Sequence, residues 1–182
     1  MLELAIFLLG SLGFIFLSRR ALKEHHLYGF PRFFAFEAIL GLVVLNGGDW
    51  FTRPFSLPQL LSWLLLIVSI FLALFSFRAL RAYGAPDSST KDAGKLGFEK
   101  TTHLVTEGPF RLIRHPLYTS LLFLAWGVAL KQINLVSIIL AIIASLALFL
   151  TAVYEERENL IKFGDEYAGY VQHSKRFIPY IF

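Results

Sequence analysis

The chain has 182 residues, of which 56% are hydrophobic and only 16% are charged. An ordinary soluble domain carries about a quarter charged residues, and the mean hydropathy of +0.62 likewise indicates an integral membrane protein. The absence of cysteine excludes disulfides and thiolate metal sites. The net charge of +4 does not indicate nucleic-acid binding, because the basic residues flank apolar segments instead of forming a stripe.

Five apolar segments predict membrane-spanning helices and therefore an all-α, polytopic membrane fold. In chain order they are Leu2–Leu17, Phe33–Gly48, Gln59–Phe77, Leu117–Leu130 and Leu135–Tyr154. A helix needs about 20 residues, with a range of about 17 to 25, to cross the hydrocarbon core. The third and fifth segments meet this length and the others are short. Four spans are therefore the alternative, if the fourth segment does not cross fully.

Basic residues are distributed unequally between the two sides of the predicted bundle. Of the 17 Lys and Arg residues, all but Arg53 and Lys131 lie in the connections that follow the first, third and fifth segments. Cytoplasmic connections carry the excess of Lys and Arg in membrane proteins. We therefore expect the N-terminus outside and the C-terminus in the cytoplasm.

The connection after the third segment divides the chain. Residues 1–81 form an N-terminal region with three spans, residues 82–116 a cytoplasmic connection, and residues 117–182 a helical hairpin with a cytoplasmic C-terminal segment. Small and polar residues at 84–90 predict a flexible loop. β-Branched and aromatic residues at 101–114 predict an ordered backbone.

Ionisable residues bracket the last two apolar segments. Arg114 and His115 precede the fourth segment, and Glu155 and Glu156 follow the fifth. An out-and-back hairpin brings both groups to the same membrane face, where ionisable residues indicate a functional site. Tyr118 adds an aromatic ring and a hydroxyl group close by.

Pro116 predicts the start of a helix, because its missing N–H is not needed in the first turn. His115 then lies at or next to the N-cap, where unsatisfied N–H groups and the helix dipole favour a carboxylate or a phosphate. Arg114 adds a permanent positive charge. The alternative interpretation is structural: Arg114 marks the headgroup region, His115 caps the helix and Tyr118 belongs to the interfacial aromatic belt.

The two glutamates after the fifth segment also have two interpretations. Glu155 could bind a cationic amine or a ribose hydroxyl of a ligand. Alternatively, Glu155 and Glu156 mark the end of the membrane and pair with Arg157 and Lys162.

Other polar features are interpreted as structural. Gly164 is expected to end a short helix after the fifth segment. Tyr167 and Tyr170, three residues apart, share one face of a C-terminal helix packed on the membrane surface. Residues 176–179 fold back either as a lid or as an anchor. His25 and His26 have no third ligand nearby in the sequence, so we expect no metal site.

Five short motifs carry a resemblance to a known family. They are residues 104–110 (LVTEGPF), 114–118 (RHPLY), 155–156 (EE), 163–167 (FGDEY) and 176–179 (RFIP). In order and spacing these motifs resemble the membrane methyltransferases of the isoprenylcysteine carboxyl methyltransferase family, which are themselves similar to phospholipid methyltransferases. The resemblance covers residues 101–182, and the first hundred residues are similar only in being membrane spans.

The resemblance implies S-adenosylmethionine as methyl donor and a lipidic or isoprenoid acceptor that offers a carboxylate, a thiol or an amine. It implies that residues 82–182 form the catalytic region, with a cytoplasmic cofactor pocket between the connection, the last two spans and the C-terminal segment. Catalytic roles fall to Arg114, His115 and Glu155. The implied cofactor contacts are His103, Leu104, Val105, Phe110, His115, Pro116, Leu117, Tyr118 and Glu155.

Three positions depart from the family pattern. Thr102 and Phe110 stand where the family often has His and Tyr, and Thr151 stands where eukaryotic members have a substrate-associated Arg. Two alternatives therefore stay open: an NADPH-binding membrane reductase of the sterol type, which carries a similar Arg-His-Pro motif, and a non-catalytic membrane scaffold with a degenerate site. The chain length and the Glu155–Glu156 pair favour methyl transfer. The acceptor and the oligomeric state are left open.

Overall fold

The structure is a computed structural model that describes residues 1–24, 28–85 and 101–181. His25, His26 and most of the predicted flexible loop at 84–90 lie outside the described residues. The described elements are α1 (Leu2–Lys23), α2 (Gly29–Leu45), α3 (Leu57–Tyr83), the 3-10 helix η2 (Gly108–Arg111), α4 (Pro116–Ala129), α5 (Leu135–Phe163) and α6 (Asp165–His173). Within these ranges there is no strand beyond one isolated bridge, so the predicted all-α fold is confirmed there.

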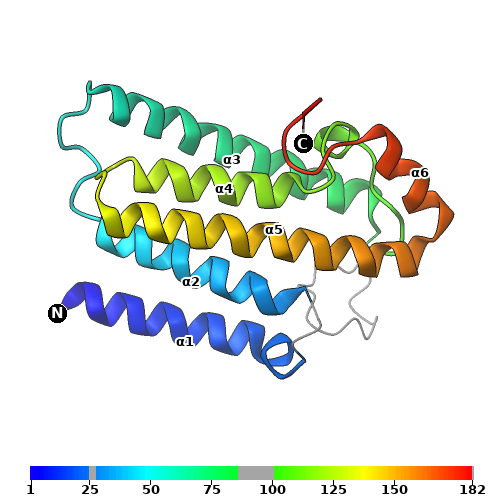
Figure 1. Cartoon of the computed structure of the whole chain (residues 1–182), viewed down its shortest axis with the longest axis horizontal. Helices are drawn as coiled ribbons and strands as arrows, with labels where there is room; N and C mark the ends of the chain where they lie inside the picture. The colour runs from blue at the N-terminus through cyan, green and yellow to red at the C-terminus, as the bar shows by residue number, and fades with distance from the viewer. Residues whose placement is uncertain (25–27, 86–100, 182) are drawn as a thin grey trace.

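The five long helices run side by side and alternate in direction (Figure 1). Helix α3 packs on α4, both α4 and α2 pack on α5, and α1 packs on the outer side of α2. The alternation brings the ends of α1, α3 and α5 and the starts of α2 and α4 to one end of the bundle, where α6 and the C-terminus also lie (Figure 1).

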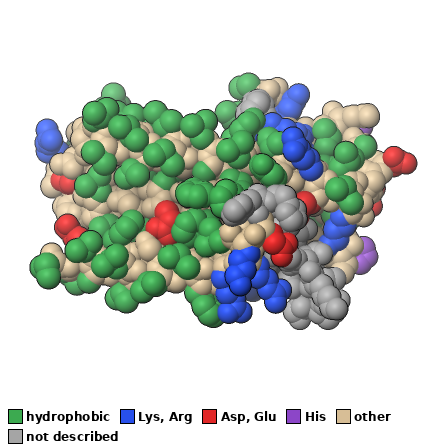
Figure 2. Space-filling view, turned by 60° about the horizontal axis from the view of Figure 1, so that its bottom comes forward, with side chains coloured by type: hydrophobic (Ala, Val, Ile, Leu, Met, Phe, Trp, Pro, Cys, Tyr) green, Lys and Arg blue, Asp and Glu red, His purple; other side chains and the backbone are tan. Residues whose placement is uncertain are grey.

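Three of the helices, α1, α3 and α5, are long and apolar enough to cross a membrane. Helices α2 and α4 have 17 and 14 residues, which correspond to about 26 and 21 Å against a hydrocarbon core of about 30 Å. Hydrophobic side chains cover much of the bundle surface, and the basic side chains in the same view gather mainly toward the α6 end (Figure 2).

Three predicted segments end too early. Helix α1 continues beyond Leu17 to Lys23, α3 beyond Phe77 to Tyr83, and α5 beyond Tyr154 to Phe163. The residues that follow each apolar stretch include good helix formers such as Arg, Lys and Glu, without Gly or Pro to interrupt them. Gly164 does end a helix as predicted, but that helix is the continuation of α5 and not a separate short helix. The φ of 54° at Gly164 is a conformation that glycine adopts readily.

Small side chains allow the helices to approach closely. The Ser62 hydroxyl on α3 donates to the Gly127 carbonyl on α4 at 2.6 Å, and a Cβ added at Gly127 would lie 3.0 Å from the Leu66 side chain. Alanines fill the contact between α2 and α5, namely Ala35, Ala38, Ala141, Ala144 and Ala147. Between helices in a bilayer there is no hydrophobic driving force, so close packing of small residues and interhelical hydrogen bonds hold the bundle.

The end of the bundle opposite α6 is held by a buried polar cluster around Gln59. Its amide nitrogen donates to the carbonyls of Asp49 and Lys131 at 3.0 and 3.2 Å, and its oxygen accepts a hydrogen bond from Lys131 Nζ at 3.1 Å. The Lys131 ammonium also lies 3.5 Å from the centroid of the Trp63 ring, a cation–π contact. Lys131 therefore ties the α4–α5 connection to the start of α3.

Replacing Gln59 with Leu removes these hydrogen bonds and leaves the buried Lys131 ammonium without its oxygen acceptor. We expect the free energy of unfolding to fall by about 1–3 kcal/mol, seen as a lower unfolding midpoint of the detergent-solubilised protein. Ser76→Ala is the control, because the buried Ser76 hydroxyl donates to the Leu72 carbonyl of its own helix. Equal losses in the two variants would contradict a tertiary role for Gln59.

Candidate functional site

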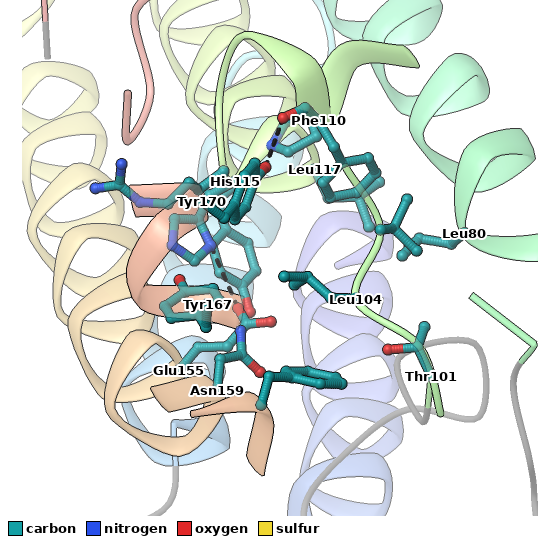
Figure 3. A pocket seen from close by; sticks show the side chains of 15 residues that line it. Leu80, Thr101, Leu104, Phe110, His115, Leu117, Glu155, Asn159, Tyr167 and Tyr170 are labelled. Atoms are coloured by element: carbon teal, nitrogen blue, oxygen red, sulfur yellow. Dashed lines mark hydrogen bonds and ion pairs between the residues drawn. The ribbon is translucent and has the colours of Figure 1, made fainter. Parts of the chain in front are cut away.

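A cleft opens at the α6 end of the bundle, where α3 and α5 end and α4 begins (Figure 3). The space of about 660 Å³ within it includes open solvent. The cleft is formed by the last turns of α3 and α5, the segment 101–118 and α6. It therefore joins parts of the chain that are far apart in sequence.

Most of the predicted site residues line this cleft. They are Leu104, Val105, Phe110, Arg114, His115, Pro116, Leu117, Tyr118 and Glu155. His103 is the exception, because it is exposed outside the lining, with its Nδ1 3.1 Å from the Thr102 hydroxyl. The predicted start of α4 is confirmed: His115 is the N-cap and Pro116 the first helical residue.

Six side chains of the lining were not assigned to the site from the sequence: Leu80, Thr101, Asn159, Phe163, Tyr167 and Tyr170. Asn159 and Phe163 follow Glu155 at intervals of four residues, which places all three on one face of a continuous helix. This signal was missed because the fifth segment was predicted to end at Tyr154. Tyr167 and Tyr170 share a helix face as predicted, with ring centroids 6.0 Å apart. This face was expected to pack on the membrane surface, whereas both side chains line the cleft.

His115 is held between two carboxylates. Its side chain is buried, with Nδ1 3.4 Å from Glu155 Oε2 and Nε2 3.3 Å from Glu156 Oε1, and its ring stacks on Tyr118 at a centroid distance of 5.4 Å. Burial by itself lowers the pKa of His115, but the hydrogen bonds and charges of Glu155 and then Glu156 outweigh it, and the pKa is raised. Only the protonated imidazolium can donate from both nitrogens.

Glu156 joins the start of α4 to the C-terminal segment. Its carboxylate accepts a hydrogen bond from Arg114 Nε at 2.8 Å and from Arg176 Nε and Nη2 at 3.1 and 2.6 Å. The Arg114 guanidinium also donates to the Ser174 carbonyl. Arg114, predicted as a catalytic residue, thus directs at least two of its donors at the protein itself.

Backbone hydrogen bonds close the same junction. The Arg114 N–H donates to the Lys175 carbonyl at 2.7 Å, and the His115 N–H donates to the Arg176 carbonyl at 3.2 Å. The Thr119 hydroxyl donates to the carbonyl of the buried Phe177 at 3.2 Å. Of the two interpretations of residues 176–179, these contacts support an anchor at Arg176 and Phe177.

Thr151, the position at which eukaryotic members carry Arg, is fully buried within the bundle. Its hydroxyl donates to the Ala147 carbonyl of the same helix at 2.7 Å, and it does not line the cleft. This position therefore supplies neither a charge nor a hydrogen-bond donor to the cleft.

The fold and the cleft define a helical membrane bundle with a polar site at one end. The family model described as phospholipid methyltransferase matches residues 58–164, more than half of the chain, and the chain belongs to this family. No curated protein and no solved structure matches it. Membership of this family confirms the predicted resemblance to membrane methyltransferases and implies methyltransferase activity. The matched region begins in α3, upstream of the motifs that carried the resemblance.

The raised pKa of His115 makes the stability of the junction depend on pH. Protonated His115 stabilises the folded state in full below its unfolded pKa of about 6.5, and this contribution is lost as the pH rises through the higher folded pKa. We expect the difference in unfolding midpoint between wild type and His115→Asn to shrink as the pH is raised above about 6.5.

His173→Asn is the matched control for this measurement, because His173 is an exposed residue of α6 whose ring contacts the Gly169 carbonyl of its own helix. Its unfolding midpoint is expected to run parallel to that of wild type. A constant difference between wild type and His115→Asn at every pH would contradict a protonated His115.

Proposed function

We propose that the protein transfers a methyl group from S-adenosylmethionine to a lipidic or isoprenoid acceptor, and that the donor binds in the cleft at the α6 end. The observation that supports this best is the position of Glu155. Its carboxylate lines the cleft, 3.4 Å from the buried His115, among the residues that carry the family motifs. A fixed negative charge in a partly enclosed cleft suits a cationic ligand.

The composition of the cleft also fits this donor. Phe110, Tyr118 and Phe163 offer aromatic surface for an adenine ring, and Leu104 and Leu117 offer aliphatic surface. S-adenosylmethionine supplies an electrophilic methyl group on a sulfonium, so the protein needs no covalent intermediate. The task left to the protein is to orient the reactants and to exclude water from the site.

We assign different tasks to the charged residues. Glu155 holds the amino group or the ribose of the donor. Arg114 and protonated His115 make the start of α4 positive, and the helix dipole adds to this potential, which suits the donor carboxylate. Because both nitrogens of His115 face Glu155 and Glu156, its proposed contribution is electrostatic and positional.

We propose that all five long helices cross the membrane, with the N-terminus outside and the cleft on the cytoplasmic side. In support, basic residues occupy the last turns of α1 and α3, among them Lys23 and Arg81, and these turns lie at the cleft end of the bundle (Figure 1). Residues 82–182 act as the catalytic region, and Leu80 of α3 completes its wall. The acceptor enters sideways from the lipid.

Calorimetry of the purified protein with S-adenosylhomocysteine tests donor binding. We expect Glu155→Ala to weaken binding about tenfold or more, because a hydrogen bond to a charged group contributes about 1.5–3 kcal/mol. His115→Ala is expected to weaken binding as well, because it removes a positive charge and the contact that positions Glu155. Glu166→Ala is the control, since Glu166 is an exposed carboxylate of α6 outside the cleft, and its binding should equal that of wild type. Unchanged binding in both site variants would refute the donor site.

Two further measurements address the reaction. Retention of the protein on immobilised NADPH, but not on an S-adenosylhomocysteine resin, would contradict methyl transfer and support the reductase alternative. Lipid mass spectrometry of cells with and without the protein should reveal a lipid heavier by one methylene unit. An unchanged lipid profile would argue against a lipidic acceptor.

A further inference from the structure

One corner of the cleft contains a buried hydroxyl group without a well-formed hydrogen bond. Tyr167 on α6 is 3% exposed, and its Oη makes no hydrogen bond of good geometry among the described residues, although the Asn159 side chain approaches it and opposes the rise of its pKa. It lines the cleft together with Glu155 and Asn159 of α5, beside which it lies in Figure 3. Because a buried polar group without a well-formed hydrogen bond is destabilising, its retention needs an explanation.

The three side chains of this corner have complementary hydrogen-bonding capacities. The Glu155 carboxylate only accepts hydrogen bonds, whereas the Asn159 amide both donates and accepts. Burial and then the negative charges of Glu156 and Glu155 raise the pKa of Tyr167, so its hydroxyl keeps the proton and can donate at neutral pH. The corner therefore offers a donor, an acceptor and an amide to a ligand in the cleft.

These capacities select one class of ligand group. An ammonium group has no lone pair to accept the Tyr167 proton. A carboxylate could accept it but would be repelled by Glu155. Neighbouring hydroxyl groups satisfy the whole corner, because each hydroxyl both donates and accepts.

We propose that Glu155, Asn159 and Tyr167 bind the adjacent ribose hydroxyls of the adenosyl ligand, with Tyr167 and Asn159 as specificity-determining residues. This inference rests on the proposed function, because it takes the ligand of the cleft to be an adenosyl compound. Of the two ligand groups proposed above for Glu155, the donor amino group and the ribose, it selects the ribose.

Tyr170 provides a matched comparison within the same helix. Its ring also lines the cleft and contacts the Tyr167 ring, but its hydroxyl donates to the Phe110 carbonyl. The Tyr170 hydroxyl therefore fastens η2 to α6, whereas the Tyr167 hydroxyl is left for a ligand. Loss of either hydroxyl keeps the ring, so the two Tyr→Phe variants differ only in the hydrogen bond that is lost.

The test is calorimetry of the full chain with S-adenosylhomocysteine and with its 2′-deoxy and 3′-deoxy analogues. In wild type, removal of a recognised ribose hydroxyl should weaken binding about 3- to 10-fold, the equivalent of one hydrogen bond. Tyr167→Phe should weaken S-adenosylhomocysteine binding by a similar factor and should no longer discriminate against at least one of the deoxy analogues. Asn159→Leu, of similar size, should lose discrimination against a deoxy analogue in the same way.

Tyr170→Phe should weaken the binding of all three ligands by the same factor. It should therefore keep the wild-type discrimination against the deoxy analogues. Wild-type discrimination in both Tyr167→Phe and Asn159→Leu would overturn the ribose assignment while leaving the donor site intact. No binding of S-adenosylhomocysteine to the wild-type protein would overturn the proposed function and this inference together. Circular dichroism of each variant verifies that it is folded. If only one of the two site variants folds, wild-type discrimination in that variant overturns the ribose assignment.

Discussion

The carboxylate of Glu156 is the point at which three separate parts of the chain meet. Arg114 and His115 approach it from the start of α4, and Arg176 from the C-terminal segment. The side chains of Arg114 and Glu156 are only 9% and 15% exposed, and at such low exposure the loss of Glu156 leaves the Arg114 charge without its carboxylate partner. The cleft depends on this junction, because it fixes His115, and His115 in turn contacts Glu155.

Two adjacent glutamates therefore have different surroundings. Successive residues of a helix point about 100° apart, so Glu155 faces the cleft while Glu156 faces Arg114 and Arg176. In our proposal, Glu155 meets the ligand and Glu156 holds the wall behind it. Such a division agrees with the general requirement that the side chains of a site be fixed by a supporting layer of contacts.

The membrane bundle positions the cleft without contributing much to its chemistry. Helices α3, α4 and α5 pack through small residues such as Ser62 and Gly127, and the polar cluster of Gln59 and Lys131 holds the opposite end. At the cleft end, α5 continues past the apolar stretch and Gly164 turns the chain into α6. The polar walls are thus extensions of the same helices that form the bundle.

Hydrophobic length, helix-breaking residues and short motifs are local properties, so the all-α class, the approximate positions of the five long helices and the family could be predicted from the sequence. Most of the residues that line the cleft could be predicted too, since Pro116 marks the start of α4 and the glutamates follow the apolar part of α5. The remaining features depend on the three-dimensional fold. Whether the helix after Tyr154 continued, and so brought Asn159 to the cleft, could not be decided from hydrophobicity alone. The position of His115 between two carboxylates, the anchoring of Arg176 and the buried hydroxyl of Tyr167 arise from contacts between residues far apart in the chain, which no local pattern encodes.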